Sequence, residues 1–384
     1  MKKLIRITTV PVSLEKLLEG QLEFMKSHFQ VLAVSSDADH LKTWGDQHQI
    51  PTRSIPMTRK ITLFADLKSL YLMYRLFLRE KPQIVHTHTP KAGIVGMLAA
   101  YFARVPIRLH TVAGLPLLIE TGVKRKILEI VEKLTFKCAT MVYPNSLVIQ
   151  EYLVNNQFLP AKKSMVIAQG SSNGIDTSYF DPQIHDDNFK RKFKAELGIP
   201  PDNLVFIFIG RLVSDKGINE LIEAYKEIKK EHSGLNLLLV GPEEPDLDPL
   251  SSQTKNYITN DKSIITTGYQ ADIRPFLSVS NVLTFPSYRE GFPNVVMQAG
   301  AMGLPAIVTN INGCNEIIKS NENGLIIPVK NALALQQSMS ELLTNREKTK
   351  NLADNSRAAI VTRFERQQIW DALLIEYKRL QARL

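Results

Sequence analysis

The 384-residue sequence lacks the features that mark several large classes of protein. It contains two cysteines, which excludes a disulfide scaffold or a cysteine-based zinc site and fits a reducing compartment. Its longest smooth apolar run, residues 92–103, is far shorter than the roughly 20 residues of a membrane-spanning helix. Arg6 and Pro11 interrupt the apolar start, so residues 4–10 are expected to form a strand rather than a secretory leader. We therefore expect a globular, cytoplasmic protein.

Acidic residues are scarce in the first half of the chain. Residues 1–165 hold 23 lysines and arginines against 12 aspartates and glutamates, whereas residues 166–384 hold 24 against 26. The first part therefore carries a net charge of +11 and the second −2, so the excess of basic residues behind the chain's net charge of +9 lies entirely in the first part. Such a half-molecule favours an anionic partner: nucleic acid, a phosphorylated substrate or an acidic lipid surface. A solvated basic surface that aids solubility is the alternative.

Short apolar runs alternate with helical patterns in both halves, which predicts an α/β fold of two Rossmann-like domains. The chain is also too long for one compact core. Helical periodicity is strongest in Leu63–Arg79, Val123–Lys137 and Gln367–Arg383. The expected strands of the first half are Leu4–Val10, Gln30–Ser35, Gln83–His88, Ile107–Thr111, Thr140–Tyr143 and Met165–Gln169. Those of the second half are Leu204–Gly210, Leu235–Gly241, Ser263–Gly268, Asn281–Pro286, Ala306–Thr309 and Gly324–Pro328.

A polar segment, Gly170–Pro201, separates the two series and is interpreted as a linker. We expect domains at residues 1–170 and 171–364, followed by a C-terminal helix at 365–384 that packs back across the junction. Ligands of such folds bind outside the carboxyl ends of the strands. The active site is therefore expected in a cleft between the domains.

The segment from Pro286 to Gln298 has the pattern strand, glycine-containing loop, helix. Amides at a helix start form an anion site suited to a diphosphate, and here they are those of Phe292, Asn294 and Val295. The carboxylate of Glu290, just before Gly291 and Pro293, is placed to accept hydrogen bonds from sugar hydroxyls. Gln298, one turn into the helix, is placed to bind a ribose diol. A plain strand–loop–helix joint with a surface glutamate is the alternative.

A second segment, Gly210 to Gly217, also follows an apolar strand and opens a helix. Its spacing is not that of a Walker loop. Arg211 and Lys216 are close enough in sequence to converge on one phosphate group. Cations at a helix start oppose the helix dipole unless an anion joins them, which favours a binding role over two surface charges.

Three histidines lie at strand ends in the first half: His86, His88 and His110. They suggest zinc, but no carboxylate or cysteine follows at ligand spacing, so no metal site is assigned. We expect His110 to face the cleft and His86 or His88 to orient neighbouring backbone.

Two Asp-x-Asp triplets, Asp37-Ala-Asp39 and Asp246-Leu-Asp248, are of the kind that holds Mn²⁺ or Mg²⁺ in another class of sugar transferases. The first is expected to cap a helix and the second to lie in a loop. Neither has a phosphate-binding context, so both are interpreted as unrelated to the chemistry.

Taken together, these segments resemble the retaining glycosyltransferases of family 4, whose fold is the two-domain GT-B arrangement. The resemblance covers almost the whole chain. It is carried by HTHTPKAG (86–93), RLHTVAGLP (108–116), YPNS (143–146), SSNGID (171–176), GRLVSDKGI (210–218), EGFPNVVMQAGAMGLP (290–305) and INGCNEII (311–318).

The resemblance implies a role for each matching position. Arg211 and Lys216 would neutralise the departing diphosphate without a metal ion or other cofactor, and Glu290 and His110 would hold the donor sugar. The family has a second glutamate where this chain has Gln298, which implies a weaker hold on the ribose. The nucleotide-sugar site implied is Gly210, Arg211, Lys216, Glu290, Gly291, Phe292, Pro293, Asn294, Val295, Gln298 and Asn173. The acceptor side implied is His86, His88 and Lys91.

The motif variants are similar to those of transferases that extend undecaprenyl-diphosphate-linked sugars in bacterial glycan, capsule and O-antigen assembly. A UDP-sugar donor of a hexose or N-acetylhexosamine follows from that resemblance, and so does a lipid-linked saccharide acceptor bound by the basic first half. The cations of Val123–Lys137 fit an interfacial helix on anionic lipid at the inner face of the cytoplasmic membrane. An ordinary covering helix with solvated lysines fits them equally.

Two other functions fit parts of the sequence. A UDP-sugar epimerase and a phosphorylase share the architecture. The epimerase would act on its UDP-sugar without an acceptor, and the phosphorylase would need pyridoxal phosphate. A basic nucleic-acid-binding protein would explain the charge, but the cations are dispersed over several elements without a known reader motif.

Overall fold

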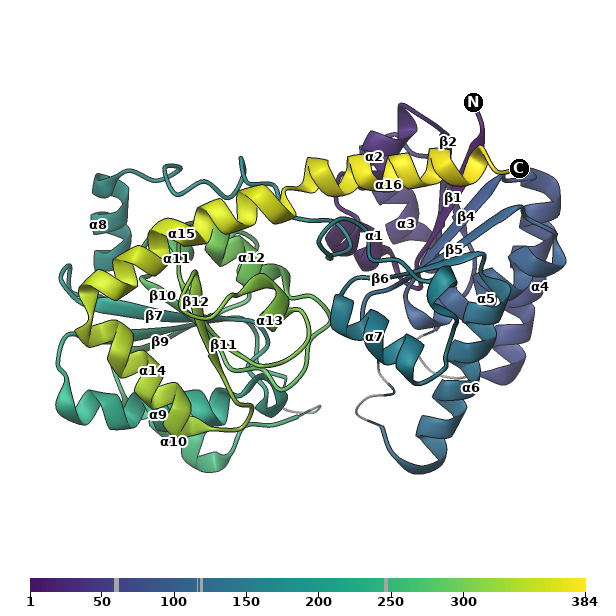
Figure 1. Ribbon diagram of the computed structural model, residues 1–384. Helices are drawn as coiled ribbons and strands as arrows, with labels where there is room; N and C mark the ends of the chain where they lie inside the picture. The colour runs from purple at the N-terminus through teal and green to yellow at the C-terminus, as the bar shows by residue number, and fades with distance from the viewer. Residues whose placement is uncertain (59–61, 116, 118–119, 245–247) are drawn as a thin grey trace. The chain divides into compact units, whose positions relative to one another are not determined.

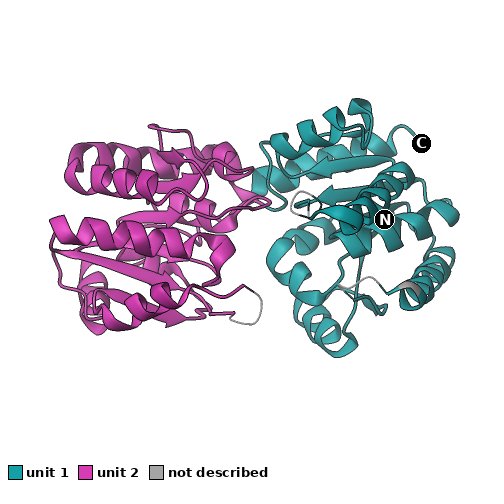
Figure 2. Ribbon diagram, turned by 90° about the horizontal axis from the view of Figure 1, so that it is seen from below, with its two compact units in different colours: residues 1–173, 367–384 teal, residues 174–366 magenta. Residues whose placement is uncertain are grey.

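The protein is described from a computed structural model, which describes residues 1–58, 62–115, 117, 120–244 and 248–384 (Figure 1). Pro116 of the second motif and Asp246 of the second Asp-x-Asp triplet lie outside the described residues. The chain divides into two compact units, residues 1–173 with 367–384 and residues 174–366 (Figure 2). Each unit has its own parallel sheet and its own core.

The first unit is built on a six-stranded parallel sheet of order β3-β2-β1-β4-β5-β6. Neighbouring strand residues such as Leu4 and Ile5 fall in different hydrophobic clusters, because successive side chains point to opposite faces of a sheet. Both faces are therefore covered. The strands are β1 (Lys3–Ile7), β2 (Gln30–Ser35), β3 (Thr52–Ser54), β4 (Ile84–His88), β5 (Ile107–Val112) and β6 (Met141–Pro144). The helices are α1 (Pro11–Leu17), α2 (Gln21–Lys26), α3 (Ala38–His48), α4 (Leu63–Glu80), α5 (Pro90–Phe102), α6 (Gly122–Cys138), α7 (Leu147–Asn155), the 3₁₀ turn η2 (Ala161–Lys163) and α16 (Arg366–Gln381).

The second unit repeats this plan with the sheet order β12-β11-β10-β7-β8-β9. The first and fourth strands of each unit are therefore neighbours, and the chain order reverses between them. The strands are β7 (Leu204–Ile209), β8 (Leu235–Val240), β9 (Ile264–Gly268), β10 (Val282–Phe285), β11 (Ala306–Thr309) and β12 (Gly324–Ile327). The helices are α8 (Asp187–Glu196), the 3₁₀ turn η3 (Ser214–Lys216), α9 (Ile218–Glu231), α10 (Ser252–Asn260), α11 (Arg274–Ser278), α12 (Asn294–Ala301), α13 (Cys314–Ile317), α14 (Ala332–Thr344) and α15 (Arg346–Phe364).

Three details differ from the sequence-based expectation. The expected strand Met165–Gln169 does not form; Ser164 makes a single bridge to Val142, and Ala168 has a φ of 49°, which ends any extended path. The short strand β3 was missed because only three residues pair with β2. The polar segment Gly170–Pro201 is not a simple linker, because it contains α8 and most of it belongs to the second unit.

The C-terminal helix α16 is part of the first unit. The hydroxyl of Tyr377, which is fully buried, accepts a hydrogen bond from Nη1 of Arg6 at 3.0 Å and also bonds Nδ1 of His86. Near the helix end, the hydroxyl of Tyr143 donates to the buried carboxylate of Glu376 at 2.9 Å. These bonds join the last helix to strands β1, β4 and β6.

Candidate active site

The loops after β7 and β10 meet at the point where the strand order of the second unit reverses. At this point α/β sheets bind ligands outside the carboxyl ends of the strands. The backbone N–H of Tyr288 donates to the carbonyl of Asp215 at 2.9 Å, which joins the two loops directly. Gly217 has a φ of 72°, and a Cβ at this position would lie 2.1 Å from the carbonyl oxygen of Pro286. Only glycine allows this close approach.

Lys216 and Glu290 form an ion pair between these two loops. Their side chains are 14% and 17% exposed, so the pair is largely withdrawn from solvent. The hydroxyl of Ser287 also donates to Oε1 of Glu290 at 3.0 Å. From the loop after β11, Nδ2 of Asn312 donates to the carbonyls of Glu290 and Gly291, at 2.5 and 2.8 Å. The glutamate is therefore held by both its side chain and its backbone.

Arg211 lies in the first of these loops and pairs with Glu244 through Nη1 at 2.7 Å. The hydrogen bond to Glu244 raises the pKa of Arg211, and the charge of Glu290 acts in the same direction. Arg211 is half-exposed, so an arriving anion can reach it. The two cations predicted to converge on a phosphate therefore have separate carboxylate partners, and the charge of Glu290 acts on both.

The start of α12 has no side-chain cap. Its N-cap is Pro293, so the first N–H groups of this eight-residue helix have no side-chain partner from that residue. Asn294 is exposed, and Val295 and Gln298 are half-buried. Phe292 is instead buried, with its ring edge-on to Phe364 at 5.5 Å. The phenylalanine anchors the loop, and Asn294 at the helix start is exposed.

His110 lies in β5 of the first unit and is 2% exposed. Its Nδ1 bonds the hydroxyl of Thr87 at 2.8 Å. Gly93 at the start of α5 packs on the ring, since a Cβ there would lie 2.5 Å from Cε1 of His110. Burial lowers the pKa of His110 to about 4, so the ring is neutral at pH 7. The glycine of the HTHTPKAG motif thus provides room for the histidine of the next motif.

His86, predicted on the acceptor side, is enclosed within the first unit. It is fully buried, and both ring nitrogens are occupied, Nδ1 by Tyr377 and Nε2 by Thr111 at 2.8 Å. Burial, with the nearby charge of Arg6, lowers the pKa of His86 well below its usual value. His86 was expected, as one of two candidates, to orient neighbouring backbone, but its two ring nitrogens bond side-chain hydroxyls instead.

His88 and Lys91, the other two residues predicted on the acceptor side, differ in whether their polar atoms have a partner. The His88 ring stacks on His86 at 4.2 Å, and its two nitrogens, both buried, have no hydrogen-bond partner among the described residues. They border a cavity of about 20 Å³ shared with Asn145. Lys91 is mostly buried and pairs with Asp66 of α4. The lysine therefore has a partner within its own unit.

Asn173 of the SSNGID motif forms hydrogen bonds within the first unit. Its Oδ1 accepts from Gln21 at 3.0 Å and from the indole of Trp370 at 2.7 Å, and its Nδ2 donates to the carbonyl of Glu19 at 2.8 Å. Because these bonds occupy both amide atoms in a buried site, Asn173 fixes the last segment of the first unit. Its contact with a nucleotide sugar stays a prediction of the family resemblance.

Comparison with known proteins identifies the chain. Residues 189–359 match the family model "Glycosyl transferases group 1", and residues 21–170 match "Glycosyl transferase 4-like domain". A capsular polysaccharide biosynthesis glycosyltransferase of Staphylococcus aureus is 34% identical over 97% of this chain and 96% of its own length. The chain belongs to the glycosyltransferase group 1 family.

Two further similarities agree with this assignment. The UDP-Gal:alpha-D-GlcNAc-diphosphoundecaprenol alpha-1,3-galactosyltransferase of Escherichia coli is 33% identical over 71% of this glycosyltransferase and 69% of its own length. A glycosyltransferase structure from Rickettsia africae superimposes with a TM-score of 0.83 at 21% identity, covering 99% and 98% of the two chains. The fold is therefore GT-B, and a transferase is favoured over an epimerase.

The Asp-x-Asp triplets of the glycosyltransferase have structural contacts. Asp37 caps α3 by accepting from the backbone N–H of His40 at 3.3 Å, as expected. In the second triplet, the described Asp248 accepts from the backbone N–H of Asp215 at 2.6 Å. Within the described part of the chain, no three His, Cys, Asp or Glu side chains gather in a way that could hold a metal ion.

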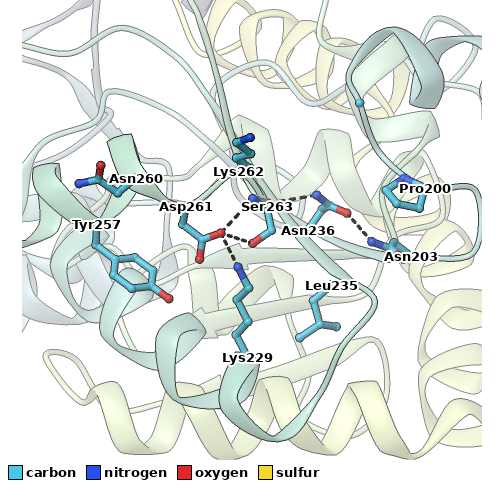
Figure 3. Close-up of a pocket in the computed structure, with 11 residues that line it drawn as sticks. Pro200, Asn203, Lys229, Leu235, Asn236, Tyr257, Asn260, Asp261, Lys262 and Ser263 are labelled. Carbon is cyan, nitrogen blue, oxygen red and sulfur yellow. Dashed lines mark hydrogen bonds and ion pairs between the residues drawn. The ribbon is translucent and has the colours of Figure 1, made fainter.

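A hollow of about 610 Å³ lies at the other edge of the second unit's sheet, next to Asn203, Leu235 and Ser263 at the amino ends of β7, β8 and β9. Figure 3 shows that its polar groups bond one another: Asp261 bonds Lys229 and Ser263. Because it lies at the amino ends of the strands, this hollow is separate from the loops that carry Lys216 and Glu290.

The sequence did not reveal several residues that shape the site. Glu244 and Asp215 hold Arg211 and Arg289 across 33 and 74 positions of sequence, and no local pattern marks such pairs. Asn312 lies in the INGCNEII motif and Asp215 in the GRLVSDKGI motif, so the family resemblance could have identified these two residues but not their partners. None of the helices in the described part of the chain is long and apolar enough to cross a bilayer.

Proposed function

We propose that this glycosyltransferase moves a hexose or N-acetylhexosamine from a UDP-sugar to a saccharide carried on undecaprenyl diphosphate, in the assembly of a cell-surface polysaccharide. The convergence of Lys216 and Glu290 from two loops carries the donor part of this proposal. The acceptor part is supported by the names of two relatives, one a capsular polysaccharide enzyme and the other acting on a diphosphoundecaprenol-linked sugar.

The donor diphosphate would bind at the carboxyl ends of β7 and β10. When the glycosidic bond to the nucleotide breaks, negative charge grows on the phosphate oxygens. Arg211, Lys216 and the uncapped first turn of α12 are fixed donors for that charge, and fixed donors need no reorganisation during the reaction. We propose that these groups replace a divalent cation and that the reaction proceeds with net retention at the anomeric carbon.

The sugar and the nucleoside would lie on either side of the diphosphate. Glu290, fixed by Ser287 and by its own backbone, would accept hydrogen bonds from sugar hydroxyls. Gln298, one turn into α12, would bind the ribose. The contact between His110 and the donor sugar stays a prediction of the family resemblance. Because the ring is neutral at pH 7, it would act as a hydrogen-bonding partner and not as a cation.

Contact with an anionic membrane is part of the proposal, since a lipid-linked acceptor lies at a bilayer surface. Helix α6 exposes four apolar side chains at helical spacing, and basic residues flank them. The apolar residues are Val123, Ile127, Ile130 and Leu134, with exposed fractions from 39% to 74%. The basic ones are Lys124, Arg125, Lys126, Lys133 and Lys137. Helix α4 of the same unit also exposes Phe64, Leu67 and Tyr71.

The direct test is mass spectrometry of the products formed from a panel of nucleotide sugars and lipid-linked acceptors. The proposal expects acceptor-dependent transfer from a UDP-sugar that persists in EDTA. Loss of activity in EDTA that Mn²⁺ restores would overturn metal independence. Consumption of the UDP-sugar without acceptor, giving its epimer, would overturn the transfer reaction itself.

The membrane contact has its own test with a matched control. Ile130 and Ile375 are equally exposed, at 66% and 67%, but Ile375 lies in α16. Sedimentation with phosphatidylglycerol vesicles should fall for Ile130→Asp and stay unchanged for Ile375→Asp. Equal loss in both variants, or equal binding to uncharged phosphatidylcholine vesicles, would contradict an electrostatic docking role for α6.

A further inference from the structure

The loop after β8 lies along the loop after β7, which carries Arg211 and Lys216. The backbone N–H of Leu212 donates to the carbonyl of Pro242 at 2.8 Å. Gly241, with a φ of 145°, approaches the carbonyl of Gly210 so closely that a Cβ would lie 1.9 Å from its oxygen. The two loops therefore leave their strands in contact, and side chains that follow Gly241 can act on residues 211–217.

Asp248 of this loop caps the turn that carries Lys216. The turn η3 begins at Ser214, and its N-cap residue, Val213, provides no side-chain acceptor. The N–H groups of a first helical turn have no partner within the turn and need one from outside. Here the N–H of Ser214 donates to the carbonyl of Asp248 at 3.2 Å, and the N–H of Asp215 donates to its Oδ2 at 2.6 Å. Asp248 thus accepts hydrogen bonds from two backbone N–H groups that lie 34 and 33 positions before it in the chain.

The opposite side of the same turn is held by the loop after β10. The carbonyl of Asp215 accepts from the N–H of Tyr288, and its carboxylate pairs with Arg289 at 2.7 Å. Lys216 is the last residue of the turn, directly before Gly217. The direction of its side chain therefore depends on a peptide segment fixed between Asp248 and the loop of Glu290.

We propose that Asp248 is a positioning residue for the transfer reaction: it fixes turn η3 so that Lys216 stays directed at Glu290 and at the donor diphosphate. The inference rests on the proposed role of Lys216. It differs from metal ligation, in which Asp-x-Asp carboxylates serve in other sugar transferases, because Oδ2 of Asp248 already accepts a backbone hydrogen bond. The cap needs an acceptor atom but no negative charge.

This distinction defines the experiment, which measures kcat and KM for the UDP-sugar in Asp248→Ala, Asp248→Asn, Lys216→Ala and the double variant Asp248→Ala with Lys216→Ala. Asp248→Ala should lower kcat/KM by about tenfold to a hundredfold, the cost of displacing a positioned group. Asp248→Asn retains an acceptor and should keep most of the activity. The double variant should be no slower than Lys216→Ala alone, because Asp248 acts through that lysine. Asp39→Ala, which changes an exposed residue of the other triplet, should behave as wild type.

Two results would overturn the inference: Asp248→Asn is as inactive as Asp248→Ala, or the losses of the two single variants multiply in the double variant. Amide hydrogen exchange at Asp215 gives a readout independent of activity, and it should be faster in Asp248→Ala. If that variant does not fold, Asp248→Ser, whose shorter side chain cannot reach the amide, takes its place. Full activity in Lys216→Ala would instead overturn the proposed donor site, which keeps the two failures distinguishable.

Discussion

Lys216 and Glu290 are 74 positions apart in the chain and form an ion pair between the loops after β7 and β10. We expect Lys216→Ala and Arg211→Ala each to lower turnover by a hundredfold or more, because each removes a fixed donor for the leaving diphosphate, worth about 2.7–4 kcal/mol of barrier. Steady-state rates measured on variants with wild-type circular dichroism check this. Near-normal rates in both variants would remove these cations from the mechanism.

We expect Glu244 to compete with the proposed donor for Arg211. The two side chains pair at 2.7 Å and are 32% and 41% exposed, so solvent screens them and the pair is worth about 0.2–1 kcal/mol. Glu244→Gln should therefore tighten donor binding by up to about fivefold while kcat changes little. Calorimetric titration with UDP would measure the affinity. Weaker UDP binding would show that Glu244 orients the guanidinium instead of competing for it.

Tyr377 anchors the C-terminal helix in the first unit, and we expect Tyr377→Phe to lower the free energy of unfolding by about 1–3 kcal/mol. The phenylalanine fills the same volume but leaves the buried Arg6 and His86 without their hydroxyl partner. Urea unfolding measures the change. Tyr269→Phe, at a tyrosine that is 67% exposed, is the control and should leave stability unchanged.

His110 should make stability depend on pH. Its folded-state pKa of about 4 lies below its usual value of 6.5, so the unfolded chain binds the proton more tightly between these values. The stabilising contribution is complete above pH 6.5 and is lost as the pH falls towards 4, by about 2 kcal/mol between pH 7.5 and pH 5. His110→Gln should be less sensitive to this pH change than wild type. If the urea midpoint of His110→Gln depends on pH as that of wild type does, the His110 ring is protonated equally readily in the folded and unfolded states.

Much of the fold followed from local patterns. Eleven of the twelve expected strands formed because parallel strands covered on both faces are nearly continuous apolar runs, which the sequence displays directly. The exception, Met165–Gln169, is equally apolar but turns at Ala168, where a positive φ depends on its surroundings. The two loops that carry Arg211, Lys216 and Glu290 were found because a strand, a glycine and a helix start are neighbours in sequence.

The sequence by itself therefore determined the α/β repeat, the family and the loops that carry the proposed donor site. Only the tertiary structure decided which side chains those loops present and which are already occupied. In the folded chain Arg211 forms an ion pair with Glu244, and the amide oxygen of Asn173 accepts a hydrogen bond from Trp370. His86 bonds Tyr377 of the C-terminal helix. Such contacts join residues 33 to 291 positions apart, and their geometry arises when the sheets and helices pack, so no local sequence pattern encodes them.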